Sequence, residues 1–236
     1  MGEDFFVVLF FNREISEIEK GGENVHLSDG ILNMQTVAVT SAAAGGMLLY
    51  SLKGMKEEEI PKVSLATAAF FTASLITVPI GPSSVHAFLG GLIGILLGRR
   101  STIAIFVGLL LQTLFFQSGG LTTLAINTVI MTLPAFVSSF LFRKLVRDGK
   151  HLAMISGLLG AFSVIQGVST FALVLYVSNS VYSEGMLSII NLLLLAHIPI
   201  VILESILTMA VISFIHKTRP GLLALSSGVE QKTLCK

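Results

Sequence analysis

Seven apolar segments follow one another between residues 34 and 215, and most of them approach the length that crosses a lipid bilayer. A hydrocarbon core about 30 Å thick takes about 20 residues of helix. Hydrophobic residues make up 53% of the chain and charged residues 12%, against about 25% charged residues in soluble domains. We therefore predict an all-α polytopic membrane protein with about seven transmembrane helices, at residues 34–53, 63–80, 84–98, 102–117, 122–142, 152–178 and 186–215.

The third and fourth segments are shorter than a bilayer requires. We expect residues 84–98 to begin in a loop that enters the protein, because irregular backbone is tolerated at membrane depth only where it is buried or lines a cavity. Gly90, Gly94 and Gly98 recur every four residues there, which predicts close packing against another helix. A similar stripe of small residues on the first segment comprises Ala38, Ala42 and Gly46.

Positive charges predict the orientation, since cytoplasmic loops are enriched in Lys and Arg. In a seven-helix arrangement every Lys and Arg beyond residue 25 falls on one side, which we assign to the cytoplasm together with the carboxy terminus. The opposite loops, 81–84, 117–120 and 178–184, hold neither residue type, so the amino terminus, counted from Val25, is expected outside. The basic set comprises Lys53, Lys56, Lys62, Arg99, Arg100, Arg143, Lys144, Arg147, Lys150, Lys217, Arg219, Lys232 and Lys236.

Residues 1–24 match neither a signal peptide nor a membrane span. The apolar run 5–11 is short, is flanked by acidic residues and lacks a cleavage site of small residues. Residues 20–23 can be encoded by a strong bacterial ribosome-binding sequence, and Val25 by the alternative start codon GTG. We interpret 1–24 as a mis-called leader, 25–220 as one transmembrane substrate-binding domain and 221–236 as a cytoplasmic tail.

With translation starting at Val25, His26 becomes the second residue of the chain. The terminal amine, the backbone nitrogen of His26 and its imidazole then chelate one divalent ion through adjoining five- and six-membered rings. Three coplanar nitrogens favour Ni(II) or Cu(II), while imidazole alone also suits zinc. His86, in an outer loop, is the candidate for the open position. The simpler interpretation of each histidine is an interfacial side chain satisfied by water or a carbonyl group.

These residues also carry a family resemblance. Residues 25–32, which begin Val-His, resemble the start of the substrate-specificity (M) component of the cobalt/nickel energy-coupling-factor (ECF) transporters. Residues 83–86 resemble the second metal-binding loop of that family, and 119–128 its Gly-Gly-Leu-Thr-Thr-Leu segment. His197 and Pro199, with Glu204, resemble the pattern of its last helix. The likeness covers nearly all of residues 25–225.

The resemblance implies a function and a set of partners. The metal ligands would be Val25, His26 and His86, and the substrate Co(II) or Ni(II), with cobalt for cobalamin biosynthesis favoured. Uptake would be driven by a transmembrane coupling (T) subunit and ATP-binding subunits in the lipid bilayer of the cell (inner) membrane, and a small accessory membrane subunit is left open. The chain itself carries no Gly-x-x-x-x-Gly-Lys-Ser/Thr nucleotide loop, so we expect no enzyme activity.

Other polar residues are candidates for supporting roles. Asp29, Ser84 and Asn127 are possible partners that would orient a metal-binding imidazole, although turn and packing roles suit them equally. His197 and Glu204 lie seven residues apart and therefore share one face of the last helix, where an ionisable residue is functional by default. For Glu204 we favour a hydrogen bond between helices over metal binding.

We exclude nucleic-acid binding, because a net charge of +1 offers no basic surface. Two other classes of protein remain as alternatives. A self-contained secondary metal-ion carrier needs ionisable residues near the bilayer midplane, for which only His197 and Glu204 are candidates. A membrane enzyme with a catalytic metal needs three protein ligands and an open position, but the outer segments hold few carboxylates. The sequence does not separate cobalt from nickel.

Overall fold

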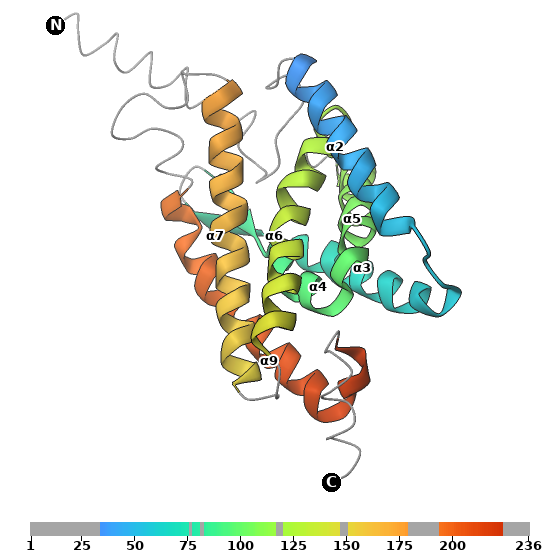
Figure 1. The fold of residues 1–236 in the computed structure, drawn as a ribbon. Helices are drawn as coiled ribbons and strands as arrows, with labels where there is room; N and C mark the ends of the chain where they lie inside the picture. The colour runs from blue at the N-terminus through green and yellow to red at the C-terminus, as the bar shows by residue number, and fades with distance from the viewer. Residues whose placement is uncertain are drawn as a thin grey trace, which may run out of the picture.

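The computed structural model describes residues 34–75, 77–80, 83–116, 120–146, 151–178 and 194–223. Nearly all regular structure there is α-helical, with short 3-10 turns and one pair of strands (Figure 1). In chain order the elements are α2 (Met34–Leu52), η1 (Glu57–Glu59), α3 (Ile60–Ser74), β1 (Thr77–Ile80), β2 (Ser83–His86), α4 (Gly90–Leu97), η2 (Gly98–Arg100), α5 (Ser101–Phe116), α6 (Leu124–Leu145), α7 (Leu152–Ser178), α9 (Ile198–Thr218) and η4 (Pro220–Leu222).

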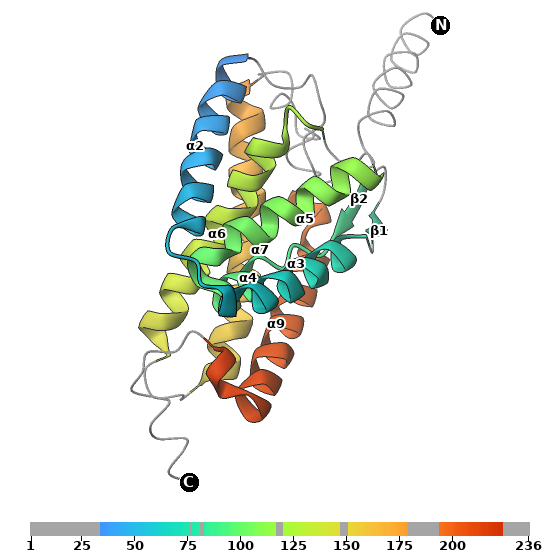
Figure 2. The same cartoon turned by 90° about the vertical axis from the view of Figure 1, so that its right-hand side faces the viewer.

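The short helix α4 lies at the centre of the molecule. Long helices α6 and α7 run side by side, α9 packs against α7, and α4 contacts all three (Figures 1 and 2). Seven of the eight residues of α4 are buried, so this helix is apolar all round, as expected of a core helix. On the other flank, α3 packs against α5, and α2 packs against α6 and α5.

Glycines allow the backbone of α4 to approach its neighbours closely. A Cβ atom at Gly94 would overlap the backbone oxygen of Ala135 in α6, which confirms the predicted close packing at this position. A Cβ atom at Gly91 would lie 2.8 Å from the Cα atom of Gly160 in α7. Gly98 has another role, because its φ of +58° ends α4 in a left-handed turn covered by Arg143.

The prediction of seven full-length membrane spans is not confirmed. In the described part of the chain, four helical segments are long and apolar enough to cross a membrane, namely Gly90–Phe116, Leu124–Leu145, Leu152–Val174 and Leu194–Thr218, of which the first contains the turn at Gly98. Helix α3 has 15 residues and α4 has eight, which correspond to only about 22 and 12 Å at a rise of ~1.5 Å per residue. Each is shorter than the hydrocarbon core, so the second and third predicted segments are partial helices.

The predicted all-α class is confirmed, and among the described residues one short strand pair is the departure from it. β1 and β2 form an antiparallel pair, in which Thr77 faces His86 and Ile80 faces Ser83. The β-branched residues of this stretch favour extended backbone. The expectation that residues 84–98 begin inside the protein is confirmed, since His86, Phe88 and Leu89 are each at most 4% exposed.

Arg100 is the centre of a cluster of polar contacts near the end of α2, which we call the basic cluster. The Arg100 guanidinium donates hydrogen bonds to the backbone oxygens of Ser51, Lys53 (3.1 Å) and Gly54 (2.8 Å), where α2 ends. It also pairs with Glu59 at 2.7 Å. Two further contacts involve basic residues, from Arg143 to Gly98 and from Lys62 Nζ to the backbone oxygen of Leu222 (2.5 Å). Arg100 thus joins the end of α2 to η1, and Lys62 joins α3 to η4.

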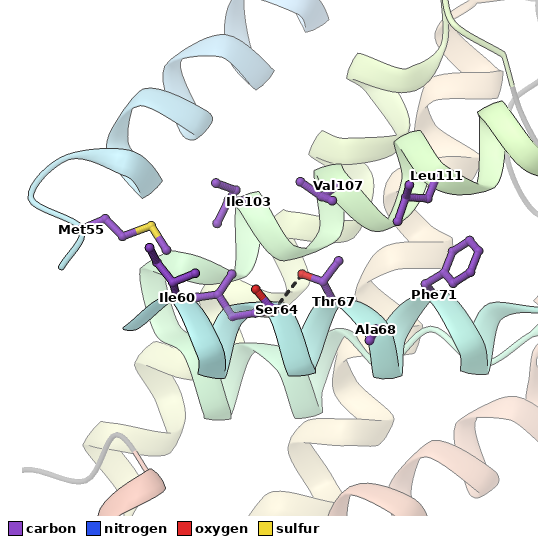
Figure 3. Close-up of a pocket in the computed structure, with 10 residues that line it drawn as sticks. Met55, Ile60, Ser64, Thr67, Ala68, Phe71, Ile103, Val107 and Leu111 are labelled. Carbon is purple, nitrogen blue, oxygen red and sulfur yellow. Dashed lines mark hydrogen bonds between the residues drawn. The ribbon is translucent and has the colours of Figure 1, made fainter. Parts of the chain in front are cut away.

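A groove of about 540 Å³ lies between α3 and α5 (Figure 3). Its wall contains no His, Cys, Asp or Glu side chain, and the hydroxyl of Thr67 is satisfied by the backbone oxygen of Val63 at 2.9 Å. The groove is therefore apolar and does not suit a metal ion. It is lined by Met55, Ile60, Val63, Ser64, Thr67, Ala68, Phe71, Ile103, Val107 and Leu111.

The contact between α4 and α6 makes a first prediction. Gly94→Ala should lower the free energy of unfolding by about 1–3 kcal/mol or more. The new Cβ atom would overlap the backbone of α6, which cannot move aside as a side chain does. Thermal unfolding in detergent micelles measures the effect. Gly46→Ala in α2 is the matched control, since its Cβ atom would meet no described atom within 4 Å. Equal unfolding temperatures of the two variants would contradict the close approach of α4 to α6.

The Arg100 cluster makes a second prediction. The hydrogen bond from Arg100 lowers the pKa of Glu59 from its usual 4.5 to about 2. A lowered pKa in the folded state stabilises the protein above pH ~4.5, and this contribution is lost as the pH falls toward ~2. Thermal unfolding of wild type and Glu59→Gln should therefore differ at pH 7 and converge near pH 2. Glu58→Gln, which removes a carboxylate not paired with Arg100, should follow wild type, and a constant difference for Glu59→Gln would refute the assignment.

Candidate metal-binding site

The loop of residues 86–89 joins the strand pair to the central helix. β2 ends at His86, and α4 begins at Gly90. Between them, Leu89 adopts a left-handed backbone conformation with φ 50° and ψ 11°, which is uncommon for a residue other than glycine. This conformation costs on the order of 1–2 kcal/mol, so surrounding contacts must hold it in place.

The buried imidazole of His86 has a defined tautomer. Its Nδ1 lies 2.9 Å from the backbone oxygen of Ala87. A carbonyl oxygen only accepts hydrogen bonds, so Nδ1 carries the proton and the lone pair of the neutral ring belongs to Nε2. This arrangement is typical of metal-binding histidines, whose second nitrogen donates to a carbonyl or carboxylate.

The surroundings of His86 favour its neutral form. Burial lowers the pKa of His86, which precedes the span that begins at Gly90. The hydrogen bond to Ala87 opposes this shift, and the nearby His197 lowers the pKa further. A neutral imidazole is the form that binds metal ions, so the ring requires no deprotonation at neutral pH.

Three contacts hold the loop against α7 and α9. The backbone N–H of Leu89 donates to Oε1 of Glu204 in α9 at 2.7 Å. The N–H of Gly91 donates to Oγ of Ser163 in α7 at 2.9 Å. The ring of Phe88 fills the space above Gly167, where a Cβ atom would lie 2.5 Å from the ring. The loop is therefore fixed on both sides of Leu89.

His197 and Glu204 share one buried face of the last helix, as their spacing predicts. His197 is 2% exposed at the start of α9, and Glu204 is fully buried two turns later. His197 interacts electrostatically with His86, whereas Glu204 binds Leu89. The loop thus contacts α9 at Glu204, which makes the predicted hydrogen bond between segments.

Of the other predicted site residues, the structure describes only some. Val25, His26 and Asp29 lie outside the described residues. Ser84 is in β2, two residues before His86. Asn127 is buried in the first turn of α6, where its backbone N–H donates to the oxygen of Thr123 at 3.0 Å. The structure therefore brings His86 together with His197 and Glu204 and leaves the proposed amino-terminal ligands untested.

Sequence reasoning missed the groups that hold the loop. The Leu89 N–H is a backbone group with no signature in the sequence, and its left-handed conformation is unexpected for leucine. Ser163 and Gly167 occur in an apolar helix without a motif around them. A serine and a glycine four residues apart on one helix are the only available signal, since such spacing marks a face suited to close packing.

The chemistry of this region is that of a partial metal site. Among the described residues, no three His, Cys, Asp or Glu side chains are grouped so that they could hold a metal ion. His86 offers one imidazole nitrogen from a rigid loop. A metal site that includes it therefore needs further ligands from other parts of the chain, from backbone groups or from water.

Comparisons with known proteins identify the family. Residues 26–222 match the model of the family CbiM, described as "Cobalt uptake substrate-specific transmembrane region". A Haemophilus influenzae protein for which metal transport is proposed is 34% identical over 83% of this chain and 95% of its own. The cobalt transport protein CbiM of Sorangium cellulosum is 31% identical over 84% and 94%, respectively.

Two further comparisons agree with this result. A protein of Archaeoglobus fulgidus, proposed as a fused nickel transport protein NikMN, is 29% identical over 84% of this chain and 68% of its own. The crystal structure of a truncated transition metal transporter shares the fold, with a TM-score of 0.70 and 22% identity over 82% of this chain and 99% of that chain. This chain therefore belongs to the CbiM family of substrate-specific transmembrane proteins of cobalt uptake.

Proposed function

We propose that this chain is the metal-binding subunit of an ATP-driven ECF importer that takes up Co(II) or Ni(II) across the cell (inner) membrane. Cobalt for cobalamin biosynthesis is the favoured substrate. The metal ion is captured at the outer face, and a transmembrane coupling subunit with separate ATP-binding subunits drives its uptake. The chain is a transport subunit and catalyses no reaction.

The observation that carries this proposal is the state of His86 in a chain of the cobalt-uptake family. Its imidazole is 3% exposed, and its Nδ1–H donates to a carbonyl oxygen, so that Nε2 is the ligating nitrogen. Burial in a loop fixed to two helices removes the entropy cost of ordering this ligand at the moment of binding. A histidine on a mobile surface loop would offer no such pre-organisation.

The remaining ligands in this proposal come from the amino terminus that starts at Val25. The terminal amine, the backbone nitrogen of His26 and the His26 imidazole supply three nitrogens, and His86 supplies the fourth. Four nitrogens in one plane suit Ni(II), and relatives named for cobalt and for nickel support both substrates. Asp29, Ser84 and Asn127 are proposed to orient these groups.

The role of His86 predicts a selective loss of metal binding. His86→Ala should weaken the affinity for Ni(II) and Co(II) by more than the ~10–100-fold that loss of a supporting partner causes, because a ligand itself is removed. Isothermal titration calorimetry on purified protein measures the affinity, and thermal unfolding without metal reports the integrity of the fold. His216→Ala, at the far end of α9, should bind like wild type. Equal binding by His86→Ala would exclude His86 as a ligand.

The amino-terminal ligands predict a dependence on chain length. The 236-residue form should bind metal more weakly, by orders of magnitude, than a form that begins at position 25 with Met, because a preceding residue converts the amine into an amide. Both forms keep the two imidazoles, so a site made of side chains alone would bind equally well in each. Calorimetry with Ni(II) and Co(II) on the two forms compares them, and equal affinities would end the terminal-amine model.

A further inference from the structure

Glu204 is a carboxyl group buried within a membrane span. It lies in α9, inside the segment Leu194–Thr218, and none of its surface is exposed. Among the described residues, no Lys, Arg or His lies within ion-pair distance of it. Its Oε1 accepts the Leu89 N–H at 2.7 Å, and its Oε2 has no hydrogen-bond partner in the described part of the chain. Its polar contacts in the described part of the chain are therefore to the backbone of the loop that carries His86, at Leu89 and Phe88.

A junction of small residues places Glu204 beside that loop. At Gly160 in α7, a Cβ atom would lie 2.7 Å from the backbone oxygen of Glu204. On its other side, Gly160 receives Gly91 of α4, whose Cβ atom would lie 2.8 Å from the Gly160 Cα atom. Helices α4, α7 and α9 therefore meet with their backbones in direct contact. This meeting sets the carboxyl group at the start of α4, where helix N–H groups lack partners within the helix.

The Leu89 N–H controls the conformation of the loop. Leu89 has a φ of +50°, whereas extended and right-handed helical backbones have a negative φ. The side chain of Phe88 is held at Gly167 and the N–H of Gly91 at Ser163, so both flanks of Leu89 are fixed to α7. The hydrogen bond to Glu204 fixes Leu89 itself to α9. We expect the turn at Leu89 to relax when this bond is lost, which would shift His86, three residues earlier in the chain.

We propose that Glu204 is a positioning residue of the metal site: its carboxyl group accepts the Leu89 N–H and so holds loop 86–89 in the conformation that presents the His86 imidazole to the metal ion. This inference rests on the proposed function, which makes His86 a ligand. Glu204 itself does not touch the metal ion. Its contribution is to reduce the reorganisation that binding would otherwise require.

Two variants separate positioning from a general role in stability. Glu204→Ala removes the acceptor for the Leu89 N–H, whereas Glu204→Gln keeps a carbonyl oxygen that can accept the same hydrogen bond. Thr208→Val is the matched control, because Thr208 is fully buried on the same face of α9, one turn later, and also borders Gly160. All three variants are made in the full chain and purified in detergent with wild type.

The first measurement is hydrogen–deuterium exchange of the metal-free proteins. We expect Glu204→Ala to speed exchange of the peptide that covers residues 86–92 at least tenfold, and Glu204→Gln and Thr208→Val to keep it within about threefold of wild type. This readout is independent of metal binding. It therefore tests the hold of Glu204 on the loop even when the wild-type protein binds neither metal, a result that would refute the proposed function separately.

The second measurement is the affinity for Ni(II) and Co(II) by calorimetry. We expect Glu204→Ala to bind ~10–100-fold more weakly than wild type, as for loss of a group that orients a ligand, and Glu204→Gln to restore most of the affinity. Wild-type affinity in Glu204→Ala, or unchanged exchange of residues 86–92, would overturn the proposal. A loss of affinity in Thr208→Val equal to that in Glu204→Ala would also overturn it, because the effect would then be general to this face. If Glu204→Ala fails to fold, the folded Glu204→Gln variant decides the question. A loss of metal affinity in Glu204→Gln without faster exchange of residues 86–92 would overturn the proposal. Retained metal affinity together with retained protection of these residues would support it.

Discussion

The backbone of α4 lies directly against the backbones of α6 and α7, and the position of loop 86–89 depends on this contact. Gly94 meets Ala135 and Gly91 meets Gly160, so each approach excludes even a methyl group. In lipid, helices gain no hydrophobic free energy by associating, and close van der Waals packing takes that role. Because α4 begins one residue after Leu89, fixing α4 between two long helices also fixes where loop 86–89 emerges. The packing of these helices therefore determines where loop 86–89 lies, and its polar contacts add to this.

Helix α4 also connects the two chemically distinct regions of the molecule. At its start are the loop with His86 and the carboxyl group of Glu204, and after its end are Gly98 and Arg100, which belongs to the basic cluster. Eight residues separate these regions by only about 12 Å. Arg100 binds backbone oxygens at the end of α2 and just beyond it, so a displacement of α4 along its axis would strain contacts at both ends. Helix α4 is therefore a short helix that joins loop 86–89 to the basic cluster, and it is too short to span a membrane by itself.

The sequence was sufficient for the membrane class and the family, and it singled out three ionisable side chains that the structure buries, whereas the predicted ligands Val25 and His26 lie outside the described residues. His86, His197 and Glu204 stand out because ionisable residues in apolar segments are rare, and their burial agrees with that signal. The lengths of α3 and α4 were predicted less well, since hydropathy counts apolar residues and does not distinguish a span from a core helix. The strand pair was missed for the same reason. The Leu89 N–H left no signal at all, because every residue except proline carries that group.

The contact between Glu204 and Leu89 shows why an acidic residue in a membrane helix is ambiguous in sequence. Such a residue suggests an ion pathway, because burial of a carboxyl group in lipid is costly without a partner. A helix that begins inside the protein has the complementary difficulty, since its first N–H groups find neither water nor a preceding turn. At the start of α4 these two requirements satisfy each other, as the carboxyl oxygen accepts the N–H at 2.7 Å. The sequence pattern of an ion carrier and that of a helix-capping carboxyl group are therefore the same, and only the partner of the carboxyl group distinguishes them.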